Sequence, residues 1–239
     1  DDWDGDDEHE FDGIDSHDPN EKHGPEGFGD RNAVAADTTM SYTIMFENME
    51  DAGPASVVRI TDQLAEGYDL RRFRLGEFAW GNTVIDVPGN RPFHLETMRL
   101  DNGMDLTLLG TVDPRTRMAT WEFRTINPET GRIPENPLLG FLPPNDENHA
   151  GEGHVTFFIT PHPEAPDQTE LKNTATIVFD TNEAIVTNET SHLVTRANLD
   201  TGVGIAADSG TLGSRAGTVE TFDGEFLTVT WDVREGSDS

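Results

Sequence analysis

Carboxylates and amides that could bind a metal ion gather in two short, turn-like stretches of the chain. Asp18 and Asn20 lie in DPNEK, whereas Asp180, Asn182 and Glu183 lie in FDTNE, directly after an apolar segment. Calcium takes about six to eight oxygen ligands of these kinds. The two stretches therefore predict a calcium-binding protein with these five residues as metal ligands. The alternative is that their side chains only hydrogen-bond the backbone of their own turns.

Two further patterns carry less chemical information. Eight histidines occur, none in the HExxH spacing of a helical zinc site, and His149, His154 and His162, in or beside a loop and strand, are a candidate group for zinc or copper. Asn188 begins the sequon Asn-Glu-Thr, which matters only in a host that attaches glycans. Neither pattern defines a catalytic centre.

The chain is strongly acidic. It has 46 Asp and Glu residues against 16 Lys and Arg, a formal net charge of −30, and only two lysines, Lys22 and Lys172. A field of this sign repels nucleic acid and anionic lipid, which excludes both as partners. Adaptation to strong brine and calcium dependence outside the cell both explain such a composition. There is no cysteine, so disulfides and thiolate chemistry are excluded.

The apolar runs are only a few residues long, far below the roughly 20 needed to cross a bilayer, so no membrane insertion is expected. The chain begins at Asp1 without a basic and apolar leader. We therefore expect a mature or excised piece of an exported protein.

Period-two alternation of apolar and polar residues runs through the middle of the chain and predicts short, half-buried strands. Turns rich in Gly, Pro, Asn and Asp separate them. Residues 73–100 give a blurred pattern that we interpret as short strands and a loop. The expected core consists of Tyr42, Ile44, Phe46, Ile60, Trp121, Phe123, Phe157, Ile159, Ile177 and Phe179.

The pattern divides the chain into three parts. Residues 1–36 form an acidic N-terminal segment too polar to fold alone, so it is docked on its neighbour or ordered by cations. Residues 37–200 form the strand-rich domain, with a proline-rich loop over 127–153. Residues 201–239 form a linker and a β hairpin of a following or neighbouring module. The predicted class is all-β, an antiparallel β-sandwich with long loops and a partial extra β module or exchanged strands at the C-terminus.

Several phrases of the sequence resemble one known family. DPNEK and GPEGFG over 18–29, SYTIMFEN, VVRITDQL, GEGHVTFFI and FDTNEAIVTN over 179–188 occur in this order. The chain from about residue 15 to 200 thus resembles the conserved repeat domain of large prokaryotic secreted and cell-surface proteins. The resemblance implies an immunoglobulin-like β-sandwich in a long exported chain, with no enzymatic activity assigned to the module.

These observations predict a non-enzymatic structural or adhesive module at the cell surface or outside the cell, in a filament, surface layer or stalk, stabilised by cations. Its expected partners are other copies or neighbouring modules, through strand addition at unpaired sheet edges. One alternative is an accessory glycan-binding module of a secreted polysaccharide-active enzyme, with Trp80 and Phe78 stacking on sugar. Another is a catalytic domain that acts through paired carboxylates.

Overall fold

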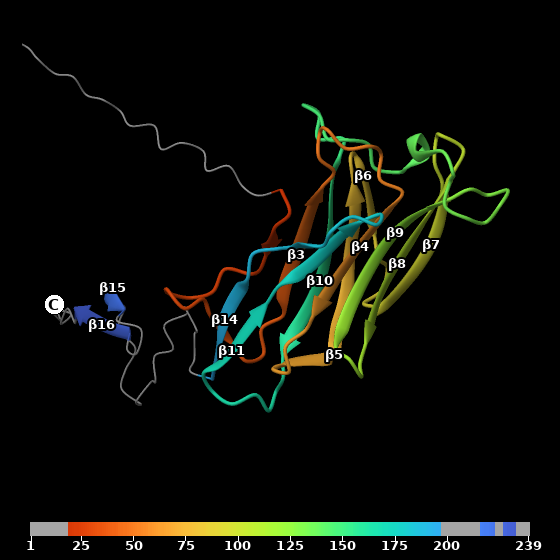
Figure 1. Ribbon diagram of the computed structural model, residues 1–239. Helices are drawn as coiled ribbons and strands as arrows, with labels where there is room; N and C mark the ends of the chain where they lie inside the picture. Colours follow the sequence, from red (N-terminus) through yellow and green to blue (C-terminus); the bar gives the residue numbers. More distant parts are fainter. Residues whose placement is uncertain (1–18, 197–215, 223–226, 233–239) are drawn as a thin grey trace, which may run out of the picture.

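The structure is a computed structural model that describes residues 19–196, 216–222 and 227–232. Two antiparallel sheets form its main body (Figure 1). The five-stranded sheet, in the order β1–β3–β10–β5–β6, has the bounds Lys22–His23, Met40–Glu47, Glu152–Pro161, Tyr68–Trp80 and Thr83–Asp86. The six-stranded sheet, in the order β13–β12–β4–β9–β8–β7, has the bounds Ile185–Val186, Ala175–Phe179, Val57–Gln63, Met118–Ile126, Asp105–Asp113 and Phe93–Arg99.

A smaller sheet, in the order β11–β14–β2, has the bounds Thr169–Asn173, Thr190–Thr195 and Ala33–Ala35. Its β14–β2 pair is parallel, an exception to the antiparallel pattern. The predicted C-terminal hairpin is present as β15 (Ala216–Phe222) paired with β16 (Leu227–Asp232). Both β1 and β2 come from the N-terminal segment, and they pair with strands of the 37–200 region.

One hydrophobic core lies between the two large sheets, and this confirms the predicted β-sandwich. Alternating strand residues face inward, as in β9, where every second residue is buried. Aromatic rings of the two sheets pack against each other in the core. The ring centroids of Phe46 (β3) and Phe123 (β9) are 5.3 Å apart, and those of Trp121 (β9) and Phe157 (β10) are 5.4 Å apart. All ten predicted core residues are buried.

Residues 73–100 contain the expected short strands and loop only from Thr83 onward, and the part before them belongs to a longer strand. The structure has a single 13-residue strand, β5, followed by β6 and β7. The pairing of β5 with β10 shifts register between Val155 and Phe157 and again between Phe158 and Thr160. Each such irregularity changes which residues face inward, so the alternation in sequence breaks although the strand continues.

The proline-rich loop is tied to the sandwich at several points. It contains the short 3₁₀ helix η1 (Pro137–Leu139) and an isolated bridge between Leu142 and Ala55. Phe141 and Leu142 are buried, and the ring of Phe141 stacks on that of Phe123 at 5.4 Å. The loop therefore closes one end of the core.

Phe157→Ala should destabilise the fold by about 3–5 kcal/mol, because the ring is fully buried among Tyr42, Phe73 and Trp121. Urea unfolding followed by tryptophan fluorescence measures the loss. Phe93→Ala is the matched control, since Phe93 is 53% exposed and its loss should change stability by no more than about 0.5 kcal/mol. A loss below about 1 kcal/mol for Phe157→Ala would contradict the assigned core.

Candidate functional site

The most unusual feature of the core is a buried ion pair between the two large sheets. Nζ of Lys22 on β1 contacts Oδ2 of Asp62 on β4, and both side chains are fully shielded from solvent. Lysine and aspartate are almost never fully buried unless they are paired, because removing their charges from water costs several kcal/mol each. The pair therefore needs an explanation beyond ordinary packing.

The strand registers bring a third polar residue, Asn173, to the same place. Asp62 follows Val58 and Ile60 at period two, so its side chain points into the core with theirs. Its partner across the ladder is Ala175 of β12. Asn173 lies two residues before Ala175 and is likewise buried, and its side chain is near enough to Asp62 to lower the pKa of that carboxyl.

The carboxamide of Asn173 is buried without a well-formed hydrogen bond. Neither its Nδ2 nor its Oδ1 has a partner of good geometry, and Oδ1 of Asp62 also lacks one. Asn173 nevertheless lies close enough to act as a hydrogen-bond donor toward Asp62 and lower the pKa of that carboxyl. We regard this contact as an approach that falls short of a full hydrogen bond. A buried amide in this state normally costs free energy.

Burial favours the neutral forms of both members of the ion pair. Desolvation lowers the pKa of Lys22, and the carboxylate of Asp62 only partly opposes this effect. Desolvation likewise raises the pKa of Asp62, against the opposing effects of Lys22 and Asn173. The shared proton can thus pass from amine to carboxyl, which leaves a neutral amine beside a carboxylic acid and a carboxamide. A neutral amine is a nucleophile, and a carboxamide is an acyl electrophile.

Aromatic side chains enclose the amine. Nζ of Lys22 lies 5.0 Å from the centroid of Tyr42 and 5.3 Å from that of Phe157. These rings contribute cation–π attraction while the amine is charged and keep its surroundings apolar.

A chain of hydrogen bonds leads from these rings to β14. Nε2 of His192 is 2.8 Å from the carbonyl oxygen of Pro25, which can only accept, so Nε2 carries the proton. In neutral His192, Nδ1 then accepts from the hydroxyl of Tyr42 at 3.2 Å. The Tyr42 oxygen in turn accepts from the hydroxyl of Tyr68 at 2.6 Å. Burial raises the pKa of both tyrosines, which stay protonated.

Four of the five residues predicted to bind calcium lie among the described residues, and Asn20 is only two residues before Lys22. Asp18 is outside the described residues, and Asn20 is buried with Oδ1 accepting from the backbone of Glu47 at 3.3 Å. Oδ1 of Asp180 accepts from two backbone N–H groups, at 3.0 Å and 2.9 Å, at the start of β4. Asn182 and Glu183 are exposed in the following turn. Within residues 19–196, no three His, Asp or Glu side chains are grouped as metal ligands. Calcium binding stays a prediction.

The other predicted groups have separate environments. Nδ1 of His149 contacts Glu152 at 2.5 Å, and Nε2 of His154 lies 3.3 Å from Glu77. Trp80 and Phe78 are buried, each with its ring against that of Phe123. These two rings are therefore core residues rather than a platform for sugar.

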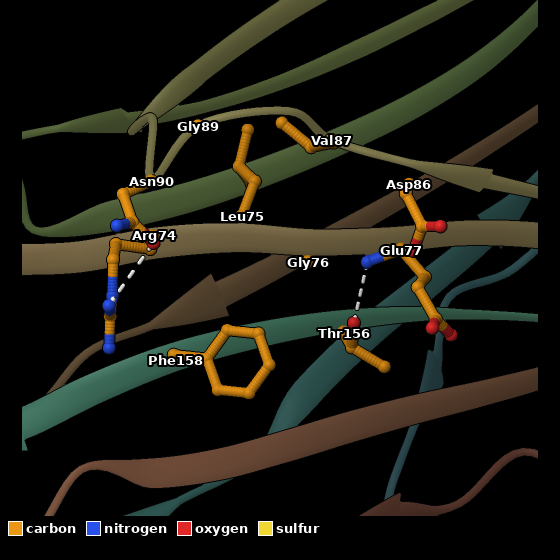
Figure 2. A pocket seen from close by; sticks show the side chains of 10 residues that line it. All are labelled: Arg74, Leu75, Gly76, Glu77, Asp86, Val87, Gly89, Asn90, Thr156 and Phe158. Carbon is orange, nitrogen blue, oxygen red and sulfur yellow. Dashed lines mark hydrogen bonds between the residues drawn. The ribbon is translucent and has the colours of Figure 1, made fainter.

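An open groove of about 520 Å³ lies on the outer side of β5, β6 and β10 (Figure 2). The guanidinium of Arg74 lies 5.8 Å from the ring of Phe158, and the hydroxyl of Thr156 accepts from the backbone of Glu77 at 2.6 Å. A side chain at Gly76 would collide with Thr156, since a Cβ there would lie 2.1 Å from its hydroxyl. The groove therefore lies where β5 and β10 approach closely, and the Thr156 hydroxyl in its lining is held by the backbone of β5.

The comparisons with known proteins give a family match over part of the chain and remote likenesses of fold. Residues 140–193 match the model of a family described as a domain of unknown function (DUF7619). No curated protein matches the chain. Among the described residues, no helix is long and apolar enough to cross a membrane.

Three solved structures illustrate the remote likeness. The N-terminal domain of the Streptococcus gordonii adhesin Sgo0707 has a TM-score of 0.40 and 13% identity, over 74% of this chain and 33% of that one. Domains D2 and D3 of the major pilin SpaD from Corynebacterium diphtheriae have a TM-score of 0.40 and 18% identity, over 72% of this chain and 51% of that one. The collagen-binding domain of a Staphylococcus aureus adhesin has a TM-score of 0.37 and 11% identity, over 75% of this chain and 99% of that one. The chain thus spans 33% and 51% of the first two structures.

The sequence interpretation missed Lys22, Asp62 and Asn173 as a group, although two signals were present. Asp62 and Asn173 each occupy the inward phase of an otherwise apolar alternation. Lys22 is one of only two lysines in the chain. Sequence does not reveal that the three meet, because they belong to three strands in three sheets.

The buried histidine predicts a dependence of stability on pH. Burial lowers the pKa of His192 below its ordinary 6.5, and nearby Lys22 lowers it further, against the hydrogen bond to Pro25. As the pH falls, His192 therefore becomes protonated at a higher pH in the unfolded chain than in the folded one. The free energy of unfolding should fall as pH drops below about 6.5.

Urea unfolding from about pH 7.5 to about pH 5.5 tests this effect, and His192→Gln should make the fall shallower. His149→Gln is the control, because exposed His149 has a raised pKa beside Glu152 and contributes with the opposite sign. An unchanged slope in His192→Gln would contradict the assigned environment.

Proposed function

We propose that the chain is a structural module of a cell-surface or extracellular assembly, and that it locks its own fold with an amide bond between Lys22 and Asn173. The observation that carries the proposal is the buried Lys22–Asp62 pair beside the unsatisfied carboxamide of Asn173. All three side chains are buried, and Asp62 interacts with both of the others.

The reaction is a transamidation that consumes both partners once. Asp62 first takes the proton of the Lys22 ammonium, and the neutral Nζ attacks Cγ of Asn173 while the new carboxylic acid hydrogen-bonds Oδ1. The tetrahedral intermediate then collapses. The Cγ–Nδ2 bond breaks, Asp62 relays a proton from Nζ to the leaving nitrogen, and ammonia departs. The product is a Nζ–Cγ amide, with no change in oxidation state.

The site favours this reaction for reasons of position and solvent. The fold holds nucleophile, proton carrier and electrophile together, which replaces a bimolecular encounter by an intramolecular step. Exclusion of water stabilises the neutral amine and protects the amide from hydrolysis. Because the product stays in the chain, the module has no turnover and is not an enzyme.

The bond suits a module that carries load. It would connect β1, near the beginning of the described residues, to β11, which is followed by β12, β13 and β14, and so close a covalent loop over residues 22–173. By analogy with a disulfide over a loop of this length, it would stabilise the fold by about 5 kcal/mol. Tension entering at β1 would pass directly to β11, a property useful in a filament, surface layer or stalk.

Other copies or neighbouring modules are the proposed partners, through strand addition. Among the described residues, β7 is the last strand of the six-stranded sheet, so the outer side of its backbone is an open edge there. It also exposes Phe93 and Leu95, at 53% and 59%. An open edge beside exposed apolar residues is the kind of surface that accepts another strand.

Mass spectrometry of the intact, purified chain tests the cross-link. The mass should be about 17 Da below that of the sequence, because one molecule of ammonia leaves. Lys22→Ala and Asn173→Ala should restore the full mass, and Asp62→Ala should prevent or greatly slow the loss. Proteolysis should release a branched peptide that contains Lys22 and Asn173.

Lys172→Ala is the matched control. It removes the other lysine, which is 52% exposed and adjacent to Asn173, and it should keep the mass loss. Asparagine cyclisation also releases ammonia but does not depend on Lys22. A folded native chain of full mass, or a loss that persists in Lys22→Ala, would rule out the cross-link.

Calcium is a second proposed source of stability, supported by the net charge of −30 and by the exposed oxygen groups of Asn182 and Glu183 beside Asp180. The melting temperature should rise when millimolar calcium is added, and by more than with sodium chloride of equal ionic strength. Glu183→Gln should reduce the excess due to calcium. A melting curve indifferent to both salts would refute cation stabilisation.

A further inference from the structure

Two hydrogen bonds from one side-chain amide hold the backbone of Lys22. The N–H of Lys22 donates to Oδ1 of Asn188 at 2.7 Å, and Nδ2 of Asn188 donates to the carbonyl of Lys22 at 3.0 Å. The amide of Asn188 thus meets Lys22 as the backbone of a neighbouring strand would, with one donor and one acceptor.

This contact matters because β1 is only two residues long. It pairs with β3 on one side, where Lys22 lies opposite Ile44. On its other side, the described residues place no further strand in the sheet. Asn188 occupies that side and fixes the position of the Lys22 backbone along the sandwich, and therefore the position from which its side chain enters the core.

The segment that carries Asn188 also holds the electrophile. Thr190 lies opposite Asn173 in the β11–β14 ladder, and its hydroxyl donates to the Asn173 carbonyl at 3.3 Å. The hydroxyl of Thr187 accepts from the N–H of Ala175 at 3.0 Å. Within residues 187–190, Asn188 therefore contacts the backbone of Lys22 and Thr190 contacts that of Asn173. Thr187 contacts the backbone of Ala175, two residues after Asn173.

We propose that Asn188 is a positioning residue for the Lys22–Asn173 cross-link, with residues 187–190 aligning nucleophile and electrophile. The inference rests on the proposed function. It also accounts for asparagine at the first position of the Asn-Glu-Thr sequon, since Nδ2, the atom to which a glycan would be attached, is the atom that donates to Lys22.

The test follows the rate of ammonia loss in the full chain. Chain recovered unfolded from inclusion bodies is refolded by dilution, and intact mass is measured over time while tryptophan fluorescence reports the folded fraction. Asn188→Ala should slow the mass loss per folded molecule by roughly ten- to a hundredfold, because small misplacements of reacting groups have effects of this size. Asn188→Asp keeps the acceptor for the Lys22 N–H but loses the donor, and its rate should be intermediate.

Asn136→Ala is the matched control. It removes an asparagine amide in the exposed loop at η1. The Oδ1 of this amide accepts one hydrogen bond, from the backbone N–H of Leu138 at 3.0 Å. Its rate should equal that of the native chain. If folded Asn188→Ala loses ammonia as fast as the native chain, the positioning role is refuted while the cross-link stands. If the folded native chain loses no ammonia, the cross-link and the positioning role fail together.

Discussion

The buried contact between Lys22 and Asp62 is the interaction on which the rest of the structure depends. It joins the N-terminal strand β1 to the opposite sheet through the centre of the core, where unpaired charges would be very costly. The cost is reduced when the proton moves to Asp62, and that transfer also produces a nucleophile. In the proposed function, the buried carboxamide of Asn173 near Asp62 is the electrophile that this nucleophile attacks.

The strand registers explain how residues so distant in sequence come together. Pairing of β12 with β4 places Ala175, two residues after Asn173, opposite Asp62, and pairing of β1 with β3 holds Lys22 in the facing sheet, from which it reaches Asp62. A shift of either register by one residue would turn these side chains outward. The alternating apolar residues of each strand therefore specify the core and, with it, the geometry of the site.

Much of the fold was predictable, because period two is a local property and the buried positions of β3, β9 and β10 follow it closely. β5 was not predictable as one strand, since its irregular pairing with β10 is set by the neighbouring strand. The site was harder to predict from the sequence than the fold. Lys22 stands in a polar phrase that reads as a loop, and its backbone is hydrogen-bonded to Asn188, 166 residues away in sequence. The calcium prediction, in contrast, used residues adjacent in sequence, and one of its two stretches, DPNEK, ends at Lys22 itself.

The central claim is that Lys22 and Asn173 are one covalent unit in the mature protein. A high-resolution crystal structure of the purified native chain tests it most directly. The account predicts continuous electron density from Nζ of Lys22 to Cγ of Asn173 at the length of an amide bond, about 1.33 Å, with Asp62 hydrogen-bonded to the new amide. Separate side chains at van der Waals distance, with an intact carboxamide on Asn173, would contradict it.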